Sequence, residues 1–299
     1  MSTCLALDIG GTKIAAAVIH NGHIERRVQV DTPSSRSPEL LSQSTRKVVL
    51  PWCSTVDFIA VASTGVIHDG QLSALNPSNL GGLNLYPLQK EIHKISGKKV
   101  WVMNDAQAAA WAEYQSLMPS VSDMAFITVS TGVGGGLVID NKLVTGKGGI
   151  AGHIGHTLAD PNGPTCGCGR QGCLESIASG RAMASFGRQY FGHDCTGKTV
   201  FEFFQRQDPN AIKIVSQSAK AIANAIANLK MSFDIQAIVL GGSIGLAPGY
   251  LPLVHRYLTS MPNAYQVPLT LACNGDDAGL IGVASWATRQ QHNSLQPLL

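Results

Sequence analysis

Four side chains within a short stretch of the chain could bind one metal ion. They supply one imidazole and three thiols, from His156, Cys166, Cys168 and Cys173. One nitrogen and three sulfur ligands form a closed tetrahedral site of the kind that holds structural zinc. The alternative is a loop with unrelated cysteines, but four such ligands seldom cluster by chance. A disulfide between cysteines separated by one residue would be strained, so the pattern predicts a Zn²⁺ site.

Two more polar residues flank this cluster and have no place in the tetrahedron. His153 lies three residues before the predicted ligand His156, and Glu175 lies two residues after the predicted ligand Cys173. Either side chain could be a solvated surface residue. Their position next to the metal loop also suggests a binding site beside the ion.

Three glycine-rich turns are suited to bind a nucleotide, two of them its phosphates and the third its base or ribose. Glycine lets backbone N–H groups approach an anion closely, and a neighbouring threonine adds a hydroxyl donor. The residues are Asp8, Gly10, Gly11, Thr12 and Lys13 in the first turn, Thr131, Gly132 and Gly134 in the second, and Gly241 and Gly242 in the third. Asp8 could hold Mg²⁺ through a water molecule, or it could cap an ordinary turn. Together the turns predict a nucleotide in a cleft between two domains.

Asn104 and Asp105 follow a short apolar run at residues 99–103. Asp105 could be the N-cap of the alanine-rich helix that we expect at residues 106–114. A carboxylate at the carboxyl end of a strand is also well placed to act as a general base. The residues alone leave both interpretations open.

Two familiar nucleotide motifs match the chain but lack their structural context. Residues 192–199, GHDCTGKT, fit the Walker A pattern, yet residues 179–191 before them look helical, and a P-loop must follow a strand. Residues 167–172 fit a dinucleotide fingerprint, but they lie inside the cysteine cluster. We therefore assign neither segment to phosphate binding.

Strand-like and helix-like segments alternate, which predicts an α/β fold. Strands are expected at residues 4–7, 13–19, 99–103, 126–129, 136–139 and 237–240, and helices at 106–114, 211–233 and 277–288. The first two strands and the pair at 126–139 share a strand–glycine turn–strand design, which suggests internal duplication. A boundary near residues 117–120 predicts one domain at 1–118, completed by a helix at 277–290, and a second domain at 119–276.

Composition limits the classes of function. Among the 299 residues, Lys and Arg outnumber Asp and Glu by 22 − 19 = 3, and basic runs are missing, so charge gives no case for a nucleic-acid partner. No window approaches the roughly 18 apolar residues of a membrane span. The cysteines outside the cluster show no pairing pattern, which fits a reducing compartment. We expect a cytoplasmic protein with no membrane partner.

The chain resembles the ROK family of sugar kinases and repressors along essentially its whole length. The resemblance lies in DIGGTK at 8–13, Asn104-Asp105, STGVGGG at 130–136, CGCGRQGCLE at 166–175 and LGGS at 240–243. Within the family, residues 63–70, 74–83, 104–113 and 151–156 are most similar to bacterial N-acetylmannosamine kinases. The resemblance implies a two-domain, actin-like or hexokinase-type ATPase fold with an interdomain cleft, and a homodimer.

The resemblance also implies a role for each site residue. Asp105 would be the catalytic base for the 6-hydroxyl of the sugar, and Asn79 and Asn104 would contact the sugar. His156 would ligate zinc through one ring nitrogen and offer the other to a sugar hydroxyl, while Glu175 would bind hydroxyls near the anomeric carbon. ATP and catalytic Mg²⁺ would be the cofactors, and Zn²⁺ would be structural.

Two departures from the common family pattern bear on the substrate. Most family kinases have Glu where this chain has His153, and their Asn-Leu-Pro-Gly-Trp loop is Asn-Leu-Gly-Gly-Leu at residues 79–83. Both departures favour N-acetylmannosamine, phosphorylated in sialic acid catabolism. The alternatives are an N-acetylglucosamine or glucose kinase and, more distantly, a sugar-responsive repressor. The repressors carry a winged-helix segment before the sugar domain, for which the motif at residue 8 leaves no room.

Overall fold

The computed structural model describes residues 2–33, 37–77 and 79–295, and the chain forms two compact units. Unit 1 comprises Met1–Gln115, Thr145–Ala151 and Asp276–Leu299. Unit 2 comprises Ser116–Val144 and Gly152–Gly275. The chain therefore passes from one unit to the other four times, and unit 1 is built from three separate segments.

Unit 1 is organised around a five-stranded sheet with the strand order β3-β2-β1-β4-β7. The strands are β1 (Thr3–Ile9), β2 (Lys13–His20), β3 (His23–Asp31), β4 (Phe58–Ser63) and β7 (Lys99–Asn104). β1, β2 and β3 pair antiparallel, whereas β1, β4 and β7 run parallel. The strands predicted at residues 4–7, 13–19 and 99–103 are confirmed. A two-stranded sheet of β5 (Val66–His68) and β6 (Gln71–Ser73) completes the strands of this unit.

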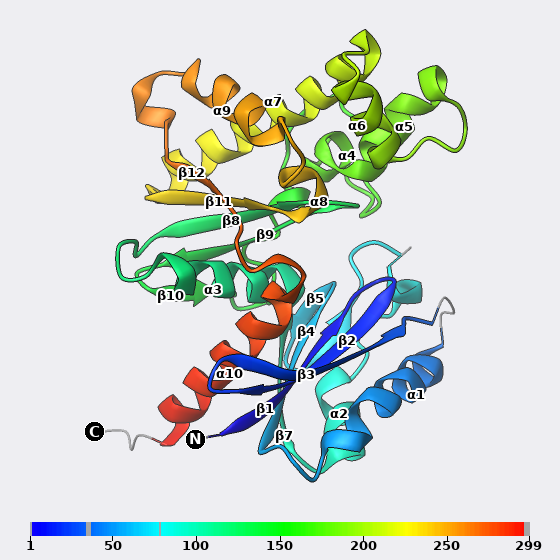
Figure 1. Cartoon of the computed structure of the whole chain (residues 1–299), viewed down its shortest axis with the longest axis vertical. Coiled ribbons are helices and arrows are strands. Elements are labelled where there is room, and N and C mark those ends of the chain that lie inside the picture. The colour runs from blue at the N-terminus through cyan, green and yellow to red at the C-terminus, as the bar shows by residue number, and fades with distance from the viewer. Residues whose placement is uncertain (1, 34–36, 78, 296–299) are drawn as a thin grey trace. The chain divides into compact units, whose positions relative to one another are not determined.

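Helices cover both faces of this sheet (Figure 1). They are α1 (Pro38–Val49), α2 (Leu88–Ser96), the start of α3 (Asp105–Leu117) and α10 (Ala278–Leu295), with short 3₁₀ turns η1 (Leu50–Trp52) and η2 (Leu80–Gly82). Alternate residues of a strand point to opposite faces. Leu5 and Leu7 of β1 join the core with α1 and α2. The small residues Ala6 and Ala62 lie on the other face and let α10 pack closely on β1 and β4.

Unit 2 repeats the same sheet design with the order β10-β9-β8-β11-β12. Its strands are β8 (Met124–Val129), β9 (Val133–Ile139), β10 (Lys142–Val144), β11 (Ala237–Gly241) and β12 (Leu269–Leu271). β8, β9 and β10 pair antiparallel, and β8, β11 and β12 run parallel. The order and direction of all five strands match those of unit 1. This match supports the internal duplication that the two glycine turns suggested.

The helices of unit 2 lie on one face of its sheet in Figure 1. They are α4 (Glu175–Ala178), α5 (Gly180–Phe191), α6 (Gly197–Gln205), α7 (Pro209–Phe233) and α9 (Tyr250–Thr259), and α8 (Gly242–Gly245) follows β11. Further 3₁₀ turns are η3 (Ile154–His156), η4 (Asn263–Tyr265) and η5 (Gly275–Asp277). The apolar faces of the α-helices of this unit pack with β8 and β11 in one buried core. The predicted helix at 211–233 is confirmed within α7, whose first turn is capped by Asp208 and begins with Pro209.

The Walker A match at residues 192–199 lies between two helices. α5 ends at Phe191, Gly192 is its C-cap, and Thr196 caps the start of α6. A helix therefore precedes the motif where a P-loop needs a strand. The rejection of this motif from the sequence is confirmed.

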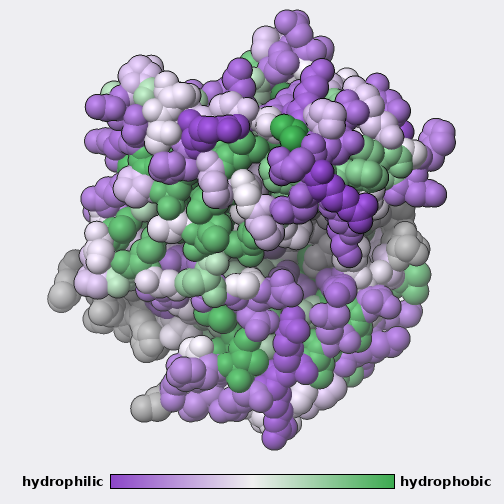
Figure 2. Space-filling model, turned by 45° about the horizontal axis from the view of Figure 1, so that its top comes forward, coloured by the Kyte–Doolittle hydropathy of each residue, from purple (hydrophilic) through white to green (hydrophobic). Residues whose placement is uncertain are grey.

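The surface is mainly polar on the face shown in Figure 2, where hydrophobic residues form small groups between hydrophilic ones. Within residues 2–33, 37–77 and 79–295, every helix is too short or too polar to cross a membrane.

Candidate functional site

The carboxyl ends of the three parallel strands of unit 1 bring the predicted carboxylates together. Ser63 at the end of β4 pairs with Ile9 on one side and with Asn104 on the other. Asp8 and Asp105 therefore lie at the same edge of the sheet, on strands that flank β4. This edge is where open α/β sheets bind their ligands.

Asn104, rather than Asp105, caps helix α3. Its Oδ1 accepts a hydrogen bond of 3.1 Å from the N–H of Gln107, three residues on, and its Nδ2 donates to the carbonyl of Gly65 at 2.9 Å. Asp105 is the first helical residue, and its Oδ1 accepts a hydrogen bond of 2.8 Å from the adjacent N–H of Ala106. The capping role left open for Asp105 thus belongs to its neighbour.

Asp105 lies in a setting that suits a proton acceptor. Burial raises the pKa of its carboxyl above the ordinary value, and hydrogen bonds from Ala106 and Asn104 act in the opposite direction. A base with a raised pKa holds an abstracted proton more readily. Helix α3 is itself anchored, because the buried Gln107 donates through Nε2 to the carbonyl of Ala151 at 2.8 Å.

Asp8 is a second carboxylate at this edge and is half-buried. Its pKa is raised to about 7, mainly by burial and also by the charge of Asp105, while the guanidinium of Arg27 acts in the opposite direction. Oδ2 of Asp8 lies 2.7 Å from the position that a Cβ on Gly279 of α10 would occupy, so a larger residue at 279 would displace the carboxylate. Arg27 is paired in turn with Asp277, at 3.2 Å. A divalent cation would stabilise the ionised form of Asp8, so the residue suits a Mg²⁺ site.

The first predicted phosphate turn is a tight β1–β2 hairpin. The N–H of Gly10 donates to the carbonyl of Lys13 at 2.9 Å and closes the turn. Gly11, Thr12 and Lys13 are exposed, and a Cβ on Gly11 would meet nothing within 4 Å. The tip of the hairpin is therefore open to an anion.

The second and third predicted turns meet within unit 2. The N–H of Ser130 donates to the carbonyl of Gly132 at 2.9 Å, and Ser130 Oγ lies 3.0 Å from Ser243 Oγ at the start of α8. Gly242 has φ +82°, and a Cβ there would lie 2.4 Å from the carbonyl oxygen of Val129. Gly241 ends β11, and Gly134 is paired within β9. Glycines thus allow the two turns to touch.

The four predicted metal ligands converge at one point. Their donor atoms all lie within 4.8 Å of one another. Cys166 Sγ is 3.7 Å from His156 Nδ1, and Cys168 Sγ is 3.7 Å from Cys173 Sγ. A tetrahedral ion with Zn–S bonds of about 2.3 Å separates two sulfurs by about 3.8 Å, whereas a disulfide joins them at about 2.05 Å. All seven cysteines are free thiols.

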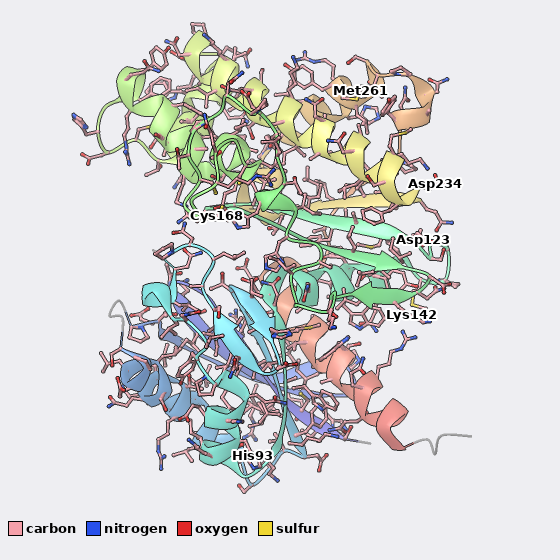
Figure 3. The ribbon with its side chains drawn as sticks, turned by 180° about the vertical axis from the view of Figure 1, so that it is seen from behind. His93, Asp123, Lys142, Cys168, Asp234 and Met261 are labelled. Carbon is pink, nitrogen blue, oxygen red and sulfur yellow. The ribbon has the colours of Figure 1, made fainter. Side chains whose placement is uncertain are left out.

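The chemistry of these donors also fits a cation. Burial raises the pKa of the Cys173 thiol to about 12 and raises that of Cys166 as well. Without a metal ion, burial thus favours the protonated thiols. A bound metal ion favours the thiolates instead, because it coordinates them. Figure 3 shows Cys168 at one end of the unit 2 sheet, opposite Asp123, Lys142 and Asp234 at the other end. The metal loop and the carboxyl end of β8 therefore share one side of the unit.

Glu175 links the metal loop to the second phosphate turn. It is the first residue of α4, two positions after Cys173, and its side chain is 13% exposed. Oε2 accepts a hydrogen bond of 3.0 Å from the N–H of Val133, and a Cβ on Gly132 would lie 2.4 Å from that same oxygen. In this position the Glu175 carboxylate leaves room only for glycine at residue 132.

The other two predicted sugar contacts lie at the ends of short helical turns. His153 precedes η3, whose last residue is the predicted ligand His156. Asn79 precedes η2 in unit 1, and Gly81 and Gly82 after it have φ of +64° and +73°. The Gly-Gly step in this loop therefore provides left-handed backbone that other residues adopt at a cost.

Arg181 is a residue that the sequence analysis missed. Its guanidinium lies 3.6 Å from Glu175 Oε1, and its own N–H donates to the carbonyl of Thr131 at 3.2 Å. A signal was present, because Arg181 is a cation in the first turn of α5, where the helix dipole disfavours positive charge. Its partners are about 6 and 50 positions away in the chain, so spacing alone did not reveal them.

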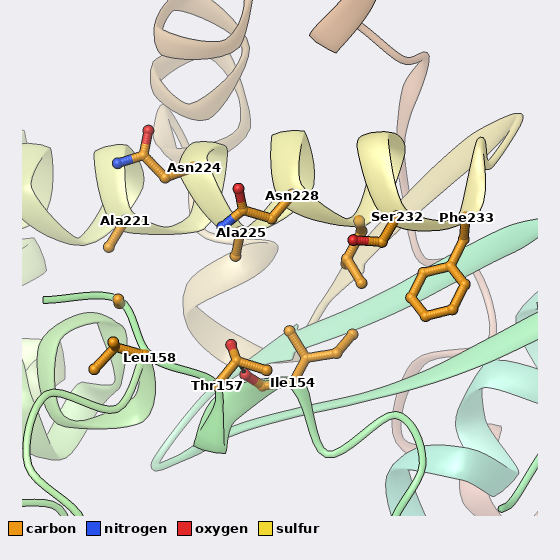
Figure 4. Close-up of a pocket in the computed structure, with 11 residues that line it drawn as sticks. Ile154, Thr157, Leu158, Ala221, Asn224, Ala225, Asn228, Ser232 and Phe233 are labelled. Carbon is orange, nitrogen blue, oxygen red and sulfur yellow. Dashed lines mark hydrogen bonds between the residues drawn. The ribbon is translucent and has the colours of Figure 1, made fainter.

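A cavity of about 210 Å³ lies behind the turn that carries His156. Ile154 and Thr157, on either side of that turn, face Asn228 and Ser232 of α7 across it (Figure 4). The turn is nevertheless anchored, because Ile154 belongs to the same buried core as Ala221 and Leu229 of α7.

Comparison with known proteins shows similarity over almost the entire chain. The family whose model matches is the ROK family, over residues 4–290. An N-acetylmannosamine kinase of Haemophilus influenzae (strain PittGG) is 55% identical over 284 residues, which cover 95% of this chain and 94% of that protein. An N-acetylmannosamine kinase of Pasteurella multocida (strain Pm70) is 49% identical and covers 95% of each chain.

The fold agrees with the sequence comparison. The crystal structure of a ROK family glucokinase from Streptomyces griseus, in complex with glucose and AMPPNP, superimposes with a TM-score of 0.80 at 30% identity. The match covers 96% of this chain and 99% of that one. The predicted α/β fold of the actin-like, hexokinase type is confirmed.

Proposed function

The chain belongs to the ROK family, and on that premise we propose that it transfers the γ-phosphoryl group of ATP to the 6-hydroxyl of N-acetyl-D-mannosamine. The observation that carries the proposal is the carboxylate of Asp105, which lies at the carboxyl end of β7 with the helix cap supplied by Asn104. The relatives named N-acetylmannosamine kinase, at about half identity over nearly full length, support the substrate.

In the proposed reaction Asp105 takes the proton of the 6-hydroxyl as its oxygen attacks the γ-phosphorus. The bond between that phosphorus and the oxygen bridging it to the β-phosphate then breaks, and ADP leaves. Phosphoryl transfer asks the protein mainly for positioning and charge stabilisation. Burial of Asp105 supports this role, because the raised pKa strengthens the carboxylate as a base. Asn104 would fix the start of α3 and hold the sugar beside it.

The phosphates would be bound by the glycine turns of both units. The exposed residues Gly11, Thr12 and Lys13 would contribute in unit 1, and Thr131, Gly132 and Gly242 in unit 2. Gly10, Gly134 and Gly241 would shape the backbone of these turns. Asp8 would hold Mg²⁺, which neutralises negative charge on the phosphates when it is bound.

Zinc would have a structural role in this enzyme. The ligands would be His156, Cys166, Cys168 and Cys173, whose 3.7 Å spacings support a tetrahedral ion. His156 would bind the ion through Nδ1 and present Nε2 to a sugar hydroxyl, and Glu175 would accept from hydroxyls near the anomeric carbon. The ion would thus shape the sugar pocket and take no part in bond breaking.

Substrate choice would depend on the two departures from the common family pattern. N-acetylmannosamine carries its acetamido group axially at C2 and needs space on one face of the ring. A neutral imidazole at residue 153 offers one acceptor nitrogen and one N–H donor, where a glutamate offers two acceptor oxygens. Asn79 would contact the sugar from a loop whose glycines, with positive φ, support an open wall.

Two other activities remain candidates. An N-acetylglucosamine or glucose kinase would use the same catalytic groups, and the glucose complex of the Streptomyces griseus relative favours it. A sugar-responsive repressor is the distant alternative. Asp105 and the phosphate turns support a kinase over a repressor, because sugar sensing alone has no need of a general base.

The test is kcat/KM for N-acetylmannosamine, N-acetylglucosamine and glucose, measured for wild type and His153→Glu. We expect wild type to prefer N-acetylmannosamine and the variant to shift the ratio toward equatorial sugars by about 5- to 150-fold, the scale of one altered contact. A wild type that prefers glucose would overturn the substrate. Unchanged ratios in the variant would remove His153 from the explanation and leave the substrate standing.

The proposal includes two features that follow from the family resemblance. We place the enzyme in the cytoplasm, where ATP is available and thiol ligands stay reduced. We also expect a homodimer, which light scattering on the purified protein would test.

A further inference from the structure

Helix α5 begins with a cation that the helix itself does not favour. Ser179 is the N-cap of α5, and Arg181 is the second helical residue. The N-terminus of a helix carries partial positive charge, so a guanidinium there is repelled unless an anion lies nearby. The anion nearby in unit 2 is Glu175.

The backbone donors of this helix end are already used. Gly180 N–H donates to the carbonyl of Ser130 at 2.8 Å, and Arg181 N–H donates to that of Thr131. The N–H of Ala182 donates to Ser179 Oγ at 3.1 Å. A phosphate at the Thr131 turn cannot rely on these amides. The guanidinium of Arg181 is the donor group of this helix end that can still turn toward it.

The guanidinium lies close to both the turn and the carboxylate. Nη2 of Arg181 is 3.7 Å from the position of a Cβ on Gly132 and 3.6 Å from Glu175 Oε1. The 3.6 Å between Arg181 Nη2 and Glu175 Oε1 is longer than the 2.7–2.9 Å of a tight charge-assisted hydrogen bond, so the ion pair is loose. The Arg181 side chain is 42% exposed, against 13% for Glu175. Arginine has five N–H donors, and one carboxylate leaves several unused.

We propose that Arg181 binds the phosphates of the nucleotide and that its ion pair with Glu175 couples nucleotide binding to sugar binding. The inference rests on the proposed kinase function, since it gives Glu175 to the sugar and the Thr131 turn to ATP. Sugar hydroxyls that donate to Glu175 weaken its hold on Arg181, and the guanidinium turns to the phosphates. The reverse follows by linkage: phosphates that attract Arg181 leave Glu175 free to accept from the sugar.

The test is calorimetric titration of the zinc-loaded protein with N-acetylmannosamine and with a non-hydrolysable ATP analogue in Mg²⁺, each alone and in the presence of the other. We expect Arg181→Gln to raise the Kd of the analogue about tenfold, the scale of one charge-assisted contact. In Arg181→Gln, the ratio of the sugar Kd without the analogue to the sugar Kd with the analogue should fall to about one. Arg181→Lys should restore part of the analogue affinity, because it keeps the charge without the planar fork.

Glu175→Gln separates this coupling from a structural effect. The variant should bind sugar more weakly yet bind the analogue alone more tightly than wild type, by about two- to fivefold, because Arg181 is released. Damage to the fold would weaken both. Arg188→Gln, on the exposed side of the same helix, is the matched control and should bind as wild type does.

Each outcome decides between the proposals. Wild-type analogue affinity and coupling in Arg181→Gln, or weaker analogue binding in Glu175→Gln, would overturn the role of Arg181. A wild type that binds the analogue but phosphorylates none of the three sugars would instead overturn the proposed kinase function. Melting temperatures of all variants show whether each is folded.

Discussion

The two units share one sheet topology but end their parallel strands with different chemistry. In unit 1 the ends of β1 and β7 carry the half-buried acids Asp8 and Asp105. In unit 2, β8, the counterpart of β1, leads into Ser130, and β11, the counterpart of β4, ends at Gly241, with Arg181 nearby. Duplication thus supplied two copies of the same edge. One copy carries negative charge, and the other combines glycine with a cation.

This difference separates two tasks that interfere with each other. A general base and a metal-binding carboxylate work where charge is poorly solvated, which is the situation that raises their pKa values. A polyphosphate needs donors and close backbone approach, and a nearby acid would repel it. The proposed base Asp105 lies on the copy that lacks the Thr131 turn, and Glu175, the acid beside that turn, is paired with Arg181.

The largest expected effect comes from neutralising the base of unit 1. Asp105→Asn should lower kcat by at least about 10²-fold, the scale of general-base catalysis, while analogue binding and melting temperature stay close to wild type. Steady-state kinetics measures this. Asp140→Asn, at an exposed turn in unit 2, is the matched control and should keep full activity. Near-normal turnover of Asp105→Asn would show that Asp105 is not the general base, and it would remove the contrast between the strand ends of the two units.

The next effect concerns the metal loop, which has no counterpart among the described elements of unit 1. Cys168→Ser should lose the zinc that we expect at one ion per chain, lower the melting temperature by several degrees and weaken sugar binding. Metal analysis and calorimetry check it. Cys273→Ser, at an exposed cysteine outside the loop, should retain the ion. If purified wild type holds no zinc, and chelators change neither stability nor sugar affinity, the metal assignment is wrong.

The smallest effect is the pH dependence of stability at Asp8. Its pKa of about 7 in the folded state exceeds the ordinary value of about 4, so the buried neutral form stabilises the fold most below about pH 4, and this contribution is lost as the pH rises toward 7. In EDTA, Asp8→Asn should therefore melt a few degrees above wild type at pH 8, with the gain shrinking toward pH 5. A variant that is less stable at pH 8 would contradict the burial argument.

Sequence reasoning succeeded where chemistry depends on neighbours in the chain. The four predicted metal ligands, His156, Cys166, Cys168 and Cys173, lie in one short loop, and their donor atoms are found within 4.8 Å of one another. The hairpin at Gly10 is likewise local, since glycine and its flanking strands specify the turn. The strands and helices around them followed from hydrophobic periodicity.

Sequence reasoning failed where the chemistry depends on contacts that form only when the chain is folded. Helix α3 starts one residue earlier than a cap at Asp105 requires, and helix ends are the least certain feature of a sequence. The approach of Gly279 to Asp8 joins residues at the two ends of the chain. Arg181 became visible only once α5 was packed against the Thr131 turn.

The segmented make-up of unit 1 has a consequence for biosynthesis. Helix α10 buries Leu280, Val283 and Ala287, packs on β1 and β4, and comes so close to α3 that a Cβ on Gly282 would lie 1.8 Å from the carbonyl oxygen of Ala108. The ribosome synthesises this helix after all of unit 2. The whole of unit 2 is therefore translated before α10 can pack on the N-terminal sheet. This is the reverse of the usual order, in which the N-terminal domain folds first during synthesis. A nascent chain that stalls before residue 278 would expose the apolar face of β1 and β4 to chaperones.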